Sequence, residues 1–294
     1  MVTENQFEPI NQEVEDLKDL YPVEYRIEPP ARFSLGLEEL WHYRELFYFF
    51  TWRDIKVKYK QAALGFLWAI LQPLALVVVF TLVFGKGLNV ETDGIPYPVF
   101  AYSGLLFWNI FASGLQSSAN SMVTNANIIR KIYFPRLIIP MSAILVSVFD
   151  FVMALVVYSG LLLYYHQSVN LARIILLLPF SLILTVIATF GLGTLLAALN
   201  VKYRDFQYTI PFLIQFLMFI NPVVYSTSIF RSETAQYVIA LNPMAGAINL
   251  SRAAFLSSSI RWDLVSISVG SAILLFMVGI YVFRKTEAYF ADLA

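Results

Sequence analysis

Six long runs of apolar residues dominate the pattern of hydrophobic and polar positions along this chain. Most of them reach the roughly 20 residues that a helix needs to cross a hydrocarbon core about 30 Å thick. The fifth run is the shortest, and we expect its helix to begin near Phe206. The pattern therefore predicts an all-α integral membrane protein with six transmembrane helices, at approximately residues 64–84, 99–122, 137–165, 174–199, 210–225 and 264–283.

Two different patterns precede the first run. Residues 1–33 are acidic and contain several prolines, and we interpret them as an acidic cytoplasmic leader. From residue 34 onward, apolar side chains recur at helical spacing and a basic stretch follows. We therefore expect residues 34–61 to be an amphipathic helix lying in the membrane interface, with a basic linker, and residues 62–294 to be the membrane domain. A soluble amphipathic helix packed on another domain is the alternative.

The segment between the fifth and sixth runs, residues 227–262, is apolar but interrupted. Asn242-Pro243, Asn249 and Arg252 make it too short and too polar to span. We expect a short re-entrant helical hairpin that enters the outer leaflet, since non-helical backbone at that depth must be buried in protein or face water. A plain external helical hairpin is equally compatible with the pattern.

Composition and charge support a membrane protein and give it an orientation. Hydrophobic residues make up 59% of the chain and charged residues 14%, against roughly 25% charged in soluble domains. Lysine and arginine concentrate at one side of the predicted spans, which the positive-inside rule places in the cytoplasm together with both termini. The cytoplasmic set is Arg53, Lys56, Lys58, Lys60, Arg130, Lys131, Arg136, Lys202, Arg204, Arg284 and Lys285; the smaller external set is Lys86, Arg173, Arg231, Arg252 and Arg261.

Motifs for catalysis or nucleotide binding are missing from the sequence. It has no cysteine, no GxxxxGK[ST] phosphate loop and no HExxH spacing, and its two histidines, His42 and His166, lie far apart. The predicted external loops hold few acidic residues for acid/base chemistry. We therefore expect no catalytic residue, no metal site and no cofactor bound by this chain, and an enzyme is not the expected class.

Asp150 is the one ionisable residue near the middle of a predicted span. An acid inside a membrane is a functional hypothesis by default, but ion-coupled carriers usually need several such groups. We favour a hydrogen bond from a Ser or Tyr hydroxyl of a neighbouring helix to this carboxyl group. Because the chain has neither an ATP site nor an ion relay, uphill transport would need a second polypeptide.

Several motifs in register resemble the ABC-2 type permeases, the transmembrane subunits of ATP-driven polysaccharide exporters. The similarity covers about residues 37–294, excludes the acidic leader, and is greatest to the O-antigen and teichoic acid exporters. The motifs are WRDIKVKYKQ at 52–61, NIIRKIYFPR at 127–136, NVKYRD at 200–205, NP at 221–222, LNP at 241–243 and RKTEAYFAD at 284–292.

The resemblance implies a homodimer in the plasma (bacterial inner) membrane that docks two copies of a cassette ATPase subunit. ATP and Mg would be held by that partner, the cargo would be a lipid-linked polysaccharide, and membrane lipids but no nucleic acid would be further partners. Docking is expected at the interface helix and the 124–136 loop, where exposed aromatic residues among cations suit a protein partner. Headgroup anchoring is the alternative. The predicted docking residues are Asp54, Tyr59, Ile129, Arg130, Lys131, Tyr133, Phe134 and Arg136.

The resemblance also implies a channel between two permeases, lined by aromatic rings on which sugars stack, with residues 227–262 as its outer gate. A stripe of aromatics can equally face lipid or pack between helices. The rival functions are an ABC-2 permease for a small lipid or drug, a membrane glycan ligase or polymerase, and a scaffold without transport. The predicted channel residues are Phe107, Trp108 and Phe111 on the second run and Phe212, Phe216 and Phe219 on the fifth.

Overall fold

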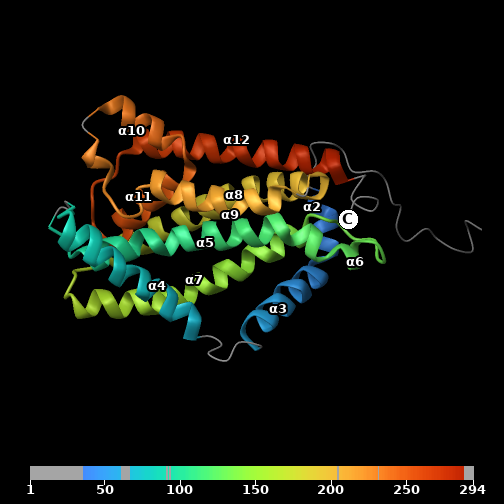
Figure 1. Ribbon diagram of the computed structural model, residues 1–294, viewed down its shortest axis with the longest axis horizontal. Helices are drawn as coiled ribbons and strands as arrows, with labels where there is room; N and C mark the ends of the chain where they lie inside the picture. The colour runs from blue at the N-terminus through green and yellow to red at the C-terminus, as the bar shows by residue number, and fades with distance from the viewer. Residues whose placement is uncertain are drawn as a thin grey trace, which may run out of the picture. The chain divides into compact units, whose positions relative to one another are not determined.

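The computed structural model describes residues 36–60, 67–90, 92, 94–203, 205–230 and 232–287 (Figure 1). Throughout these residues the regular structure is helical and no strand occurs, which confirms the predicted all-α class. The predicted leader, residues 1–33, lies outside the described residues.

Five helical segments are long and apolar enough to cross a membrane. Each coincides with one of the predicted runs, and the first continues from α4 (Leu67–Phe80) into a π-helical turn, η2 (Thr81–Gly87). The other four are α5 (Tyr97–Thr124), α7 (Ile138–Tyr164), α8 (Leu171–Lys202) and α12 (Trp262–Glu287).

The fifth predicted run forms α9 (Phe206–Ile220), which begins at Phe206 as expected. It has 15 residues, or roughly 22 Å at 1.5 Å per residue, which is less than a full hydrocarbon core. The helix ends at Asn221-Pro222 because proline disfavours a helical conformation in the residue before it. The count of six spans therefore stays a prediction that depends on α9.

The long helices lie side by side in a bundle (Figure 1). α5 is its centre, since it packs against both α7 and α8, and α8 packs in turn against α12. The first half of α5 is almost entirely buried, including Tyr102, Leu105 and Phe107. Helix α5 therefore supplies one face to the core of the bundle and leaves a second, more polar face for the groove described below.

Two helices approach closely where glycine removes the side chain. A Cβ atom built on Gly279 of α12 would lie 2.0 Å from the carbonyl oxygen of Gly191 on α8, and one on Gly191 would lie 2.5 Å from the backbone nitrogen of Phe276. Both neighbours are backbone atoms, which cannot rotate away as a side chain can. The α8–α12 contact therefore requires glycine at both positions.

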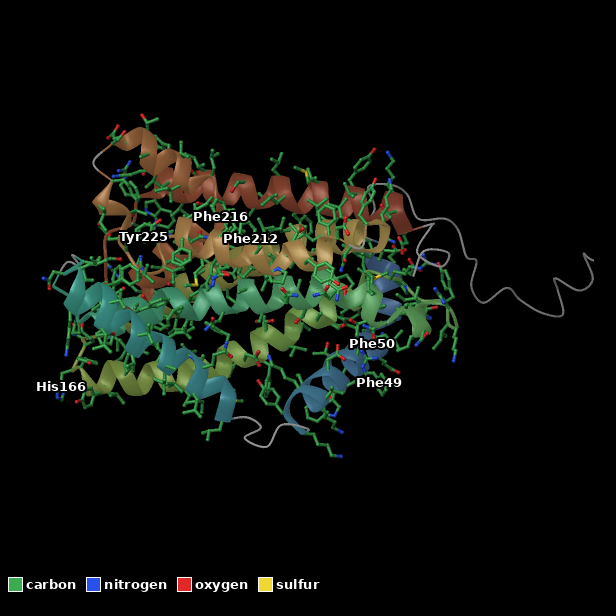
Figure 2. The ribbon with its side chains drawn as sticks, viewed as in Figure 1. Phe49, Phe50, His166, Phe212, Phe216 and Tyr225 are labelled. Atoms are coloured by element: carbon green, nitrogen blue, oxygen red, sulfur yellow. The ribbon has the colours of Figure 1, made fainter. Side chains whose placement is uncertain are left out.

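The predicted interfacial segment forms α2 (Leu37–His42) and α3 (Arg44–Lys60). The basic residues lie on the second half of α3 rather than in a separate linker, so the helix is longer than the sequence pattern indicated. Phe50 is buried against the ring of Phe134 in the loop before α7, whereas its neighbour Phe49 is exposed (Figure 2). Lys56 lies over the exposed ring of Trp52 at 5.2 Å, and such aromatic and cationic pairs suit a membrane interface.

Residues 227–262 contain two helices, α10 (Glu233–Ala240) and α11 (Pro243–Leu256). Asn242 caps α11, because its side chain accepts a hydrogen bond from the Met244 nitrogen at 3.1 Å and Pro243 occupies the first helical position. Nearly all of α11 is buried against α5, α8 and α12. The segment thus holds two α-helices. Its arrangement as a re-entrant hairpin and its depth in a membrane stay predictions.

Candidate functional site

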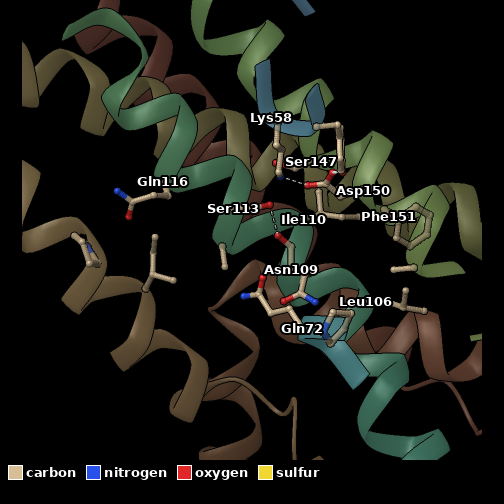
Figure 3. A pocket seen from close by; sticks show the side chains of 16 residues that line it. Lys58, Gln72, Leu106, Asn109, Ile110, Ser113, Gln116, Ser147, Asp150 and Phe151 are labelled. Carbon is tan, nitrogen blue, oxygen red and sulfur yellow. Dashed lines mark hydrogen bonds and ion pairs between the residues drawn. The ribbon is translucent and has the colours of Figure 1, made fainter. Parts of the chain in front are cut away.

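A groove of about 520 Å³ opens on one side of the bundle, between α3, α4, α5, α7 and α9 (Figure 3). Although these helices are mostly apolar, several of the side chains that line the groove are polar. A cavity that collects polar side chains among apolar helices is typical of a substrate or ion pathway, because polar groups facing lipid are costly. Apart from Tyr59, the uncharged polar residues at the groove are Gln72, Asn109, Ser113, Gln116 and Ser147.

The second face of α5 supplies most of these groups. Asn109, Ser113 and Gln116 are spaced four and three residues apart, so they lie on one side of the helix. The Ser113 hydroxyl donates to the Asn109 carbonyl oxygen at 2.6 Å. In contrast, the side-chain amides of Gln72, Asn109 and Gln116 have no hydrogen-bond partner within the described part of the chain. These amides are free to donate to and accept from a polar molecule in the groove.

Asp150 lies at the edge of the groove and is bound by two residues of α3 (Figure 3). Lys58 forms an ion pair with its carboxylate, and the Tyr59 hydroxyl donates a hydrogen bond to it. Burial and the contact with Asp150 raise the pKa of Tyr59, so the phenol keeps the proton that it donates. The expected hydrogen bond from a hydroxyl of another helix is confirmed, and the ion pair with Lys58 is an addition that sequence reasoning missed.

The aromatic residues predicted to line a channel fall into two groups. Phe107, Trp108 and Phe111 are at most 3% exposed and belong to the bundle core, where the Phe107 ring packs 5.2 Å from that of Phe151. The structure therefore does not bring these three residues to the groove. Their helix presents Asn109 and Ser113 there instead.

The second group, on α9, is exposed. Phe212, Phe216 and Phe219 have exposed fractions of 68%, 54% and 56%, and the rings of Phe212 and Phe216 stack with centroids 6.3 Å apart (Figure 2). The same helix contributes Pro211 and Ile214 to the groove. The α9 phenylalanines thus form an aromatic face on a helix that borders the groove.

A second pocket, of about 220 Å³, lies in the loop that follows the short helix α6 (Ala126–Ile129). Ile129 and Phe134 form its buried side, and the Phe134 ring packs 5.6 Å from Phe50 of α3. Ile132 and Tyr133 are exposed. The structure thus gathers six of the eight predicted docking residues in one pocket: Ile129, Arg130, Lys131, Tyr133, Phe134 and Arg136.

The remaining two predicted docking residues lie elsewhere. Asp54 pairs with the adjacent Arg53 on α3, with a nitrogen–oxygen distance of 2.7 Å, and Tyr59 faces Asp150 at the groove. Phe134 also departs from the expectation of exposed aromatic residues in this loop, because it is buried. The sequence pattern alone cannot show that Phe134 is buried and Tyr133 exposed, since both residues are aromatic and they are adjacent.

Hydrogen bonds connect this loop and the residue before α6 to three other helices. The Tyr133 hydroxyl donates to a carboxylate oxygen of Glu39 on α2 at 3.2 Å. Arg53 of α3 donates to the Asn125 side-chain oxygen at 2.8 Å, next to α6. Arg136 donates to the Glu287 carbonyl oxygen at the end of α12. A force applied to this loop would therefore reach α2, α3 and α12 directly.

Arg252 of α11 is buried, with 5% of its surface exposed. Its guanidinium donates to the carbonyl oxygens of Val223 at 2.8 Å and Tyr225 at 3.2 Å, and it lies 3.7 Å from the centroid of the Phe100 ring. The sequence marked Arg252 as an interruption in an apolar stretch and as one of the external cations, with no structural role. The structure shows that it links α11 and α5 to the segment that follows α9.

We expect Arg252→Met to lower the thermal midpoint of the purified protein and to increase protease cleavage near residues 221–225. Hydrogen bonds from a charged group contribute about 1.5–3 kcal/mol each, and two are lost together with the contact to Phe100. Arg173→Met is the matched control, because Arg173 is exposed. Equal midpoints for the two variants would contradict the linking role of Arg252.

Comparison of the sequence with known proteins identifies the family of this chain. The profile described as ABC-2 type transporter matches residues 45–256. An O-antigen export system permease protein RfbA of Klebsiella pneumoniae is 30% identical over 243 residues, which cover 83% of this chain and 92% of that protein. An RfbA of Myxococcus xanthus is 30% identical over 74% of this chain and 83% of its own, and the polysialic acid transport protein KpsM of Escherichia coli is 26% identical over 69% and 78%. This chain therefore belongs to the ABC-2 type transporter family.

Proposed function

We propose that this chain is the membrane-spanning permease subunit of an ATP-driven exporter that moves a lipid-linked polysaccharide across the plasma membrane. The observation that carries the proposal is the groove of about 520 Å³, whose unpaired amides suit the hydroxyl groups of sugars. The names of the relatives, which include O-antigen export and polysialic acid transport, support the same cargo class. O-antigen and teichoic acid are the expected kinds of polymer.

The energy for export would come from a separate cassette ATPase, two copies of which would serve two permeases and hold the ATP and Mg. The pocket at residues 129–136 supports docking there, because it combines exposed Ile132 and Tyr133 with Arg130 and Lys131. The hydrogen bonds from this region to α2, α3 and α12 provide a route by which closure of the ATPase would move the bundle.

A second copy of the permease would complete the path. α4 leaves Val78 and Val79 exposed and its continuation η2 leaves Leu82 exposed. On α9, Phe212 and Phe216 are exposed, and α4 and α9 are two of the helices that border the groove. Two copies that meet along these helices would bring their grooves together, with the aromatic face of α9 available to stack on sugar rings. In this arrangement α9 is the sixth span, both termini are cytoplasmic, and α10 with α11 forms the outer gate.

The rival functions have less support. A permease for an apolar small lipid or drug has no use for a row of unpaired amides. A glycan ligase or polymerase would use external arginines, but buried Arg252 is engaged with two backbone carbonyls and an aromatic ring. That residue is therefore not available as a catalytic group.

Removal of the gene tests the proposal. We expect the surface polysaccharide to disappear and its lipid-linked form to accumulate in the cytoplasmic leaflet, because synthesis continues while export stops. The plasmid-borne native gene should restore export, and the purified permease should form a complex with its ATPase. Unchanged surface glycan in the deletion strain, or ATP hydrolysis by the permease alone, would refute the proposed function.

A further inference from the structure

The charges at the groove balance each other. Among the described residues that line it, the charged side chains are Lys58 and Asp150, and these two form an ion pair. The other polar groups there are amides and hydroxyls, which carry no formal charge. The groove therefore offers hydrogen bonds to a ligand but no unpaired charge.

This balance determines which polymer the groove can accept at low energetic cost. A carboxylate on every repeat of a polymer would lose water on entering the groove and would find its nearest cation already neutralised by Asp150. A hydroxyl-rich, uncharged repeat exchanges its water for the amides of Gln72, Asn109 and Gln116, which have no partner within the described chain. Neutral sugars match both features of the lining.

We propose that the repeating units that pass through this groove are uncharged sugars, selected by the amides of Gln72, Asn109 and Gln116 and by the neutralised Lys58–Asp150 pair. The inference rests on the proposed function and adds the substrate class. It concerns the repeats and not the phosphate groups of the lipid carrier, and among the expected polymers it selects O-antigen with uncharged repeats over teichoic acid, whose repeats carry phosphate. Asp150 acts as a specificity-determining residue by cancelling the charge of Lys58.

The test uses the complex of permease and ATPase in proteoliposomes with two lipid-linked probes of equal length. One probe is built of unsubstituted hexoses, and the other carries a uronic acid in every repeat. We expect the native complex to export the neutral probe at least about tenfold faster than the acidic probe, a ratio that corresponds to a tenfold difference in affinity. Leucine substitution of Asn109 and Gln116 together should lower export of the neutral probe, while Ser159→Leu, at an exposed position of α7, should not.

A charge switch separates selectivity from a purely structural role of the ion pair. Asp150→Asn keeps an acceptor for Lys58 and Tyr59 but leaves Lys58 uncompensated, so the preference should shift toward the acidic probe by about tenfold. The double variant Lys58→Gln with Asp150→Asn is neutral again and should return the ratio to the native value. If the role of the ion pair is purely structural, both variants should lose export of both probes to a similar extent, and the ratio of neutral to acidic export should not change.

The outcomes distinguish this inference from the proposed function. Equal export of the two probes by the native complex, or an unchanged ratio in Asp150→Asn, overturns the substrate class and leaves the exporter function standing. Export of neither probe, although the complex hydrolyses ATP, counts against the exporter function itself, and the inference fails with it.

Discussion

Replacing Ile132 with serine and Tyr133 with alanine together should weaken association with the ATPase subunit about 100-fold, because central aromatic and apolar residues of an interface contribute about 2 kcal/mol or more when truncated. Both side chains are exposed at the rim of the 129–136 pocket, so their loss leaves the fold of the permease intact. Export should fall with complex formation. The measurement is the amount of ATPase that copurifies with the tagged permease, together with the surface polysaccharide.

The chain offers a matched control at the end of α7. Leu163 and Tyr164 are also an adjacent aliphatic and aromatic pair with large exposed surfaces, but they lie far in sequence from the docking loop. Leu163→Ser with Tyr164→Ala should leave the complex assembled. Tyr133→Phe keeps the ring and removes only the hydrogen bond to Glu39, so it should retain most of the binding. Normal copurification and export by the Ile132/Tyr133 variant would rule out docking at this pocket.

Phe134 is a poorer probe of docking, although it belongs to the same loop. Its ring is buried against Phe50, so alanine at this position would leave a cavity and cost about 3–5 kcal/mol of stability. A loss of complex in that variant would not distinguish docking from unfolding. The exposed neighbours provide the sharper experiment.

Alanine at Gly279 should destabilise the bundle by about 3 kcal/mol, the upper part of the usual range for overpacked positions. The new Cβ would meet the Gly191 carbonyl oxygen at 2.0 Å, and α8 and α12 would have to separate. The comparison is Gly270→Ala on the same helix, where no atom lies within 4 Å of the added Cβ. Since alanine favours helix over glycine by about 1 kcal/mol, Gly270→Ala should be neutral or stabilising.

Denaturation of the purified protein in detergent, followed by its helical signal, measures the difference between these two variants. The same chemical change on one helix is expected to destabilise at Gly279 and not at Gly270, which excludes a general effect of alanine on helix propensity or insertion. If Gly279→Ala unfolds at the same denaturant concentration as Gly270→Ala, the close α8–α12 contact is absent in solution.

The sequence predicted the positions of the helices better than the roles of individual side chains. The start of α9 at Phe206 and the five long segments follow from uninterrupted apolar runs, which are local properties of the chain. The sequence also allowed the prediction that the docking residues between 129 and 136 lie together, because they are nearly contiguous in the chain. The motif resemblance identified the family that the profile match shows.

The channel residues illustrate where local reasoning stops. Phe107, Trp108 and Phe111 on α5, and Phe212, Phe216 and Phe219 on α9, have the same aromatic character in the sequence. The structure buries the first three and exposes the other three. Whether a ring faces lipid, a neighbouring helix or a groove depends on which helices surround it. Helical spacing alone contains no information on those neighbours.

The sequence by itself determined that the chain is a helical membrane protein and approximately where its long helices lie, because the length of an apolar run decides whether it can cross a bilayer. Only the tertiary structure decided that Asp150, the one acid in the middle of a predicted span, is neutralised by Lys58, since these residues are 92 positions apart. It likewise decided that amides from α4 and α5 share one groove. Such pairings depend on helix packing, in which residues distant in sequence meet.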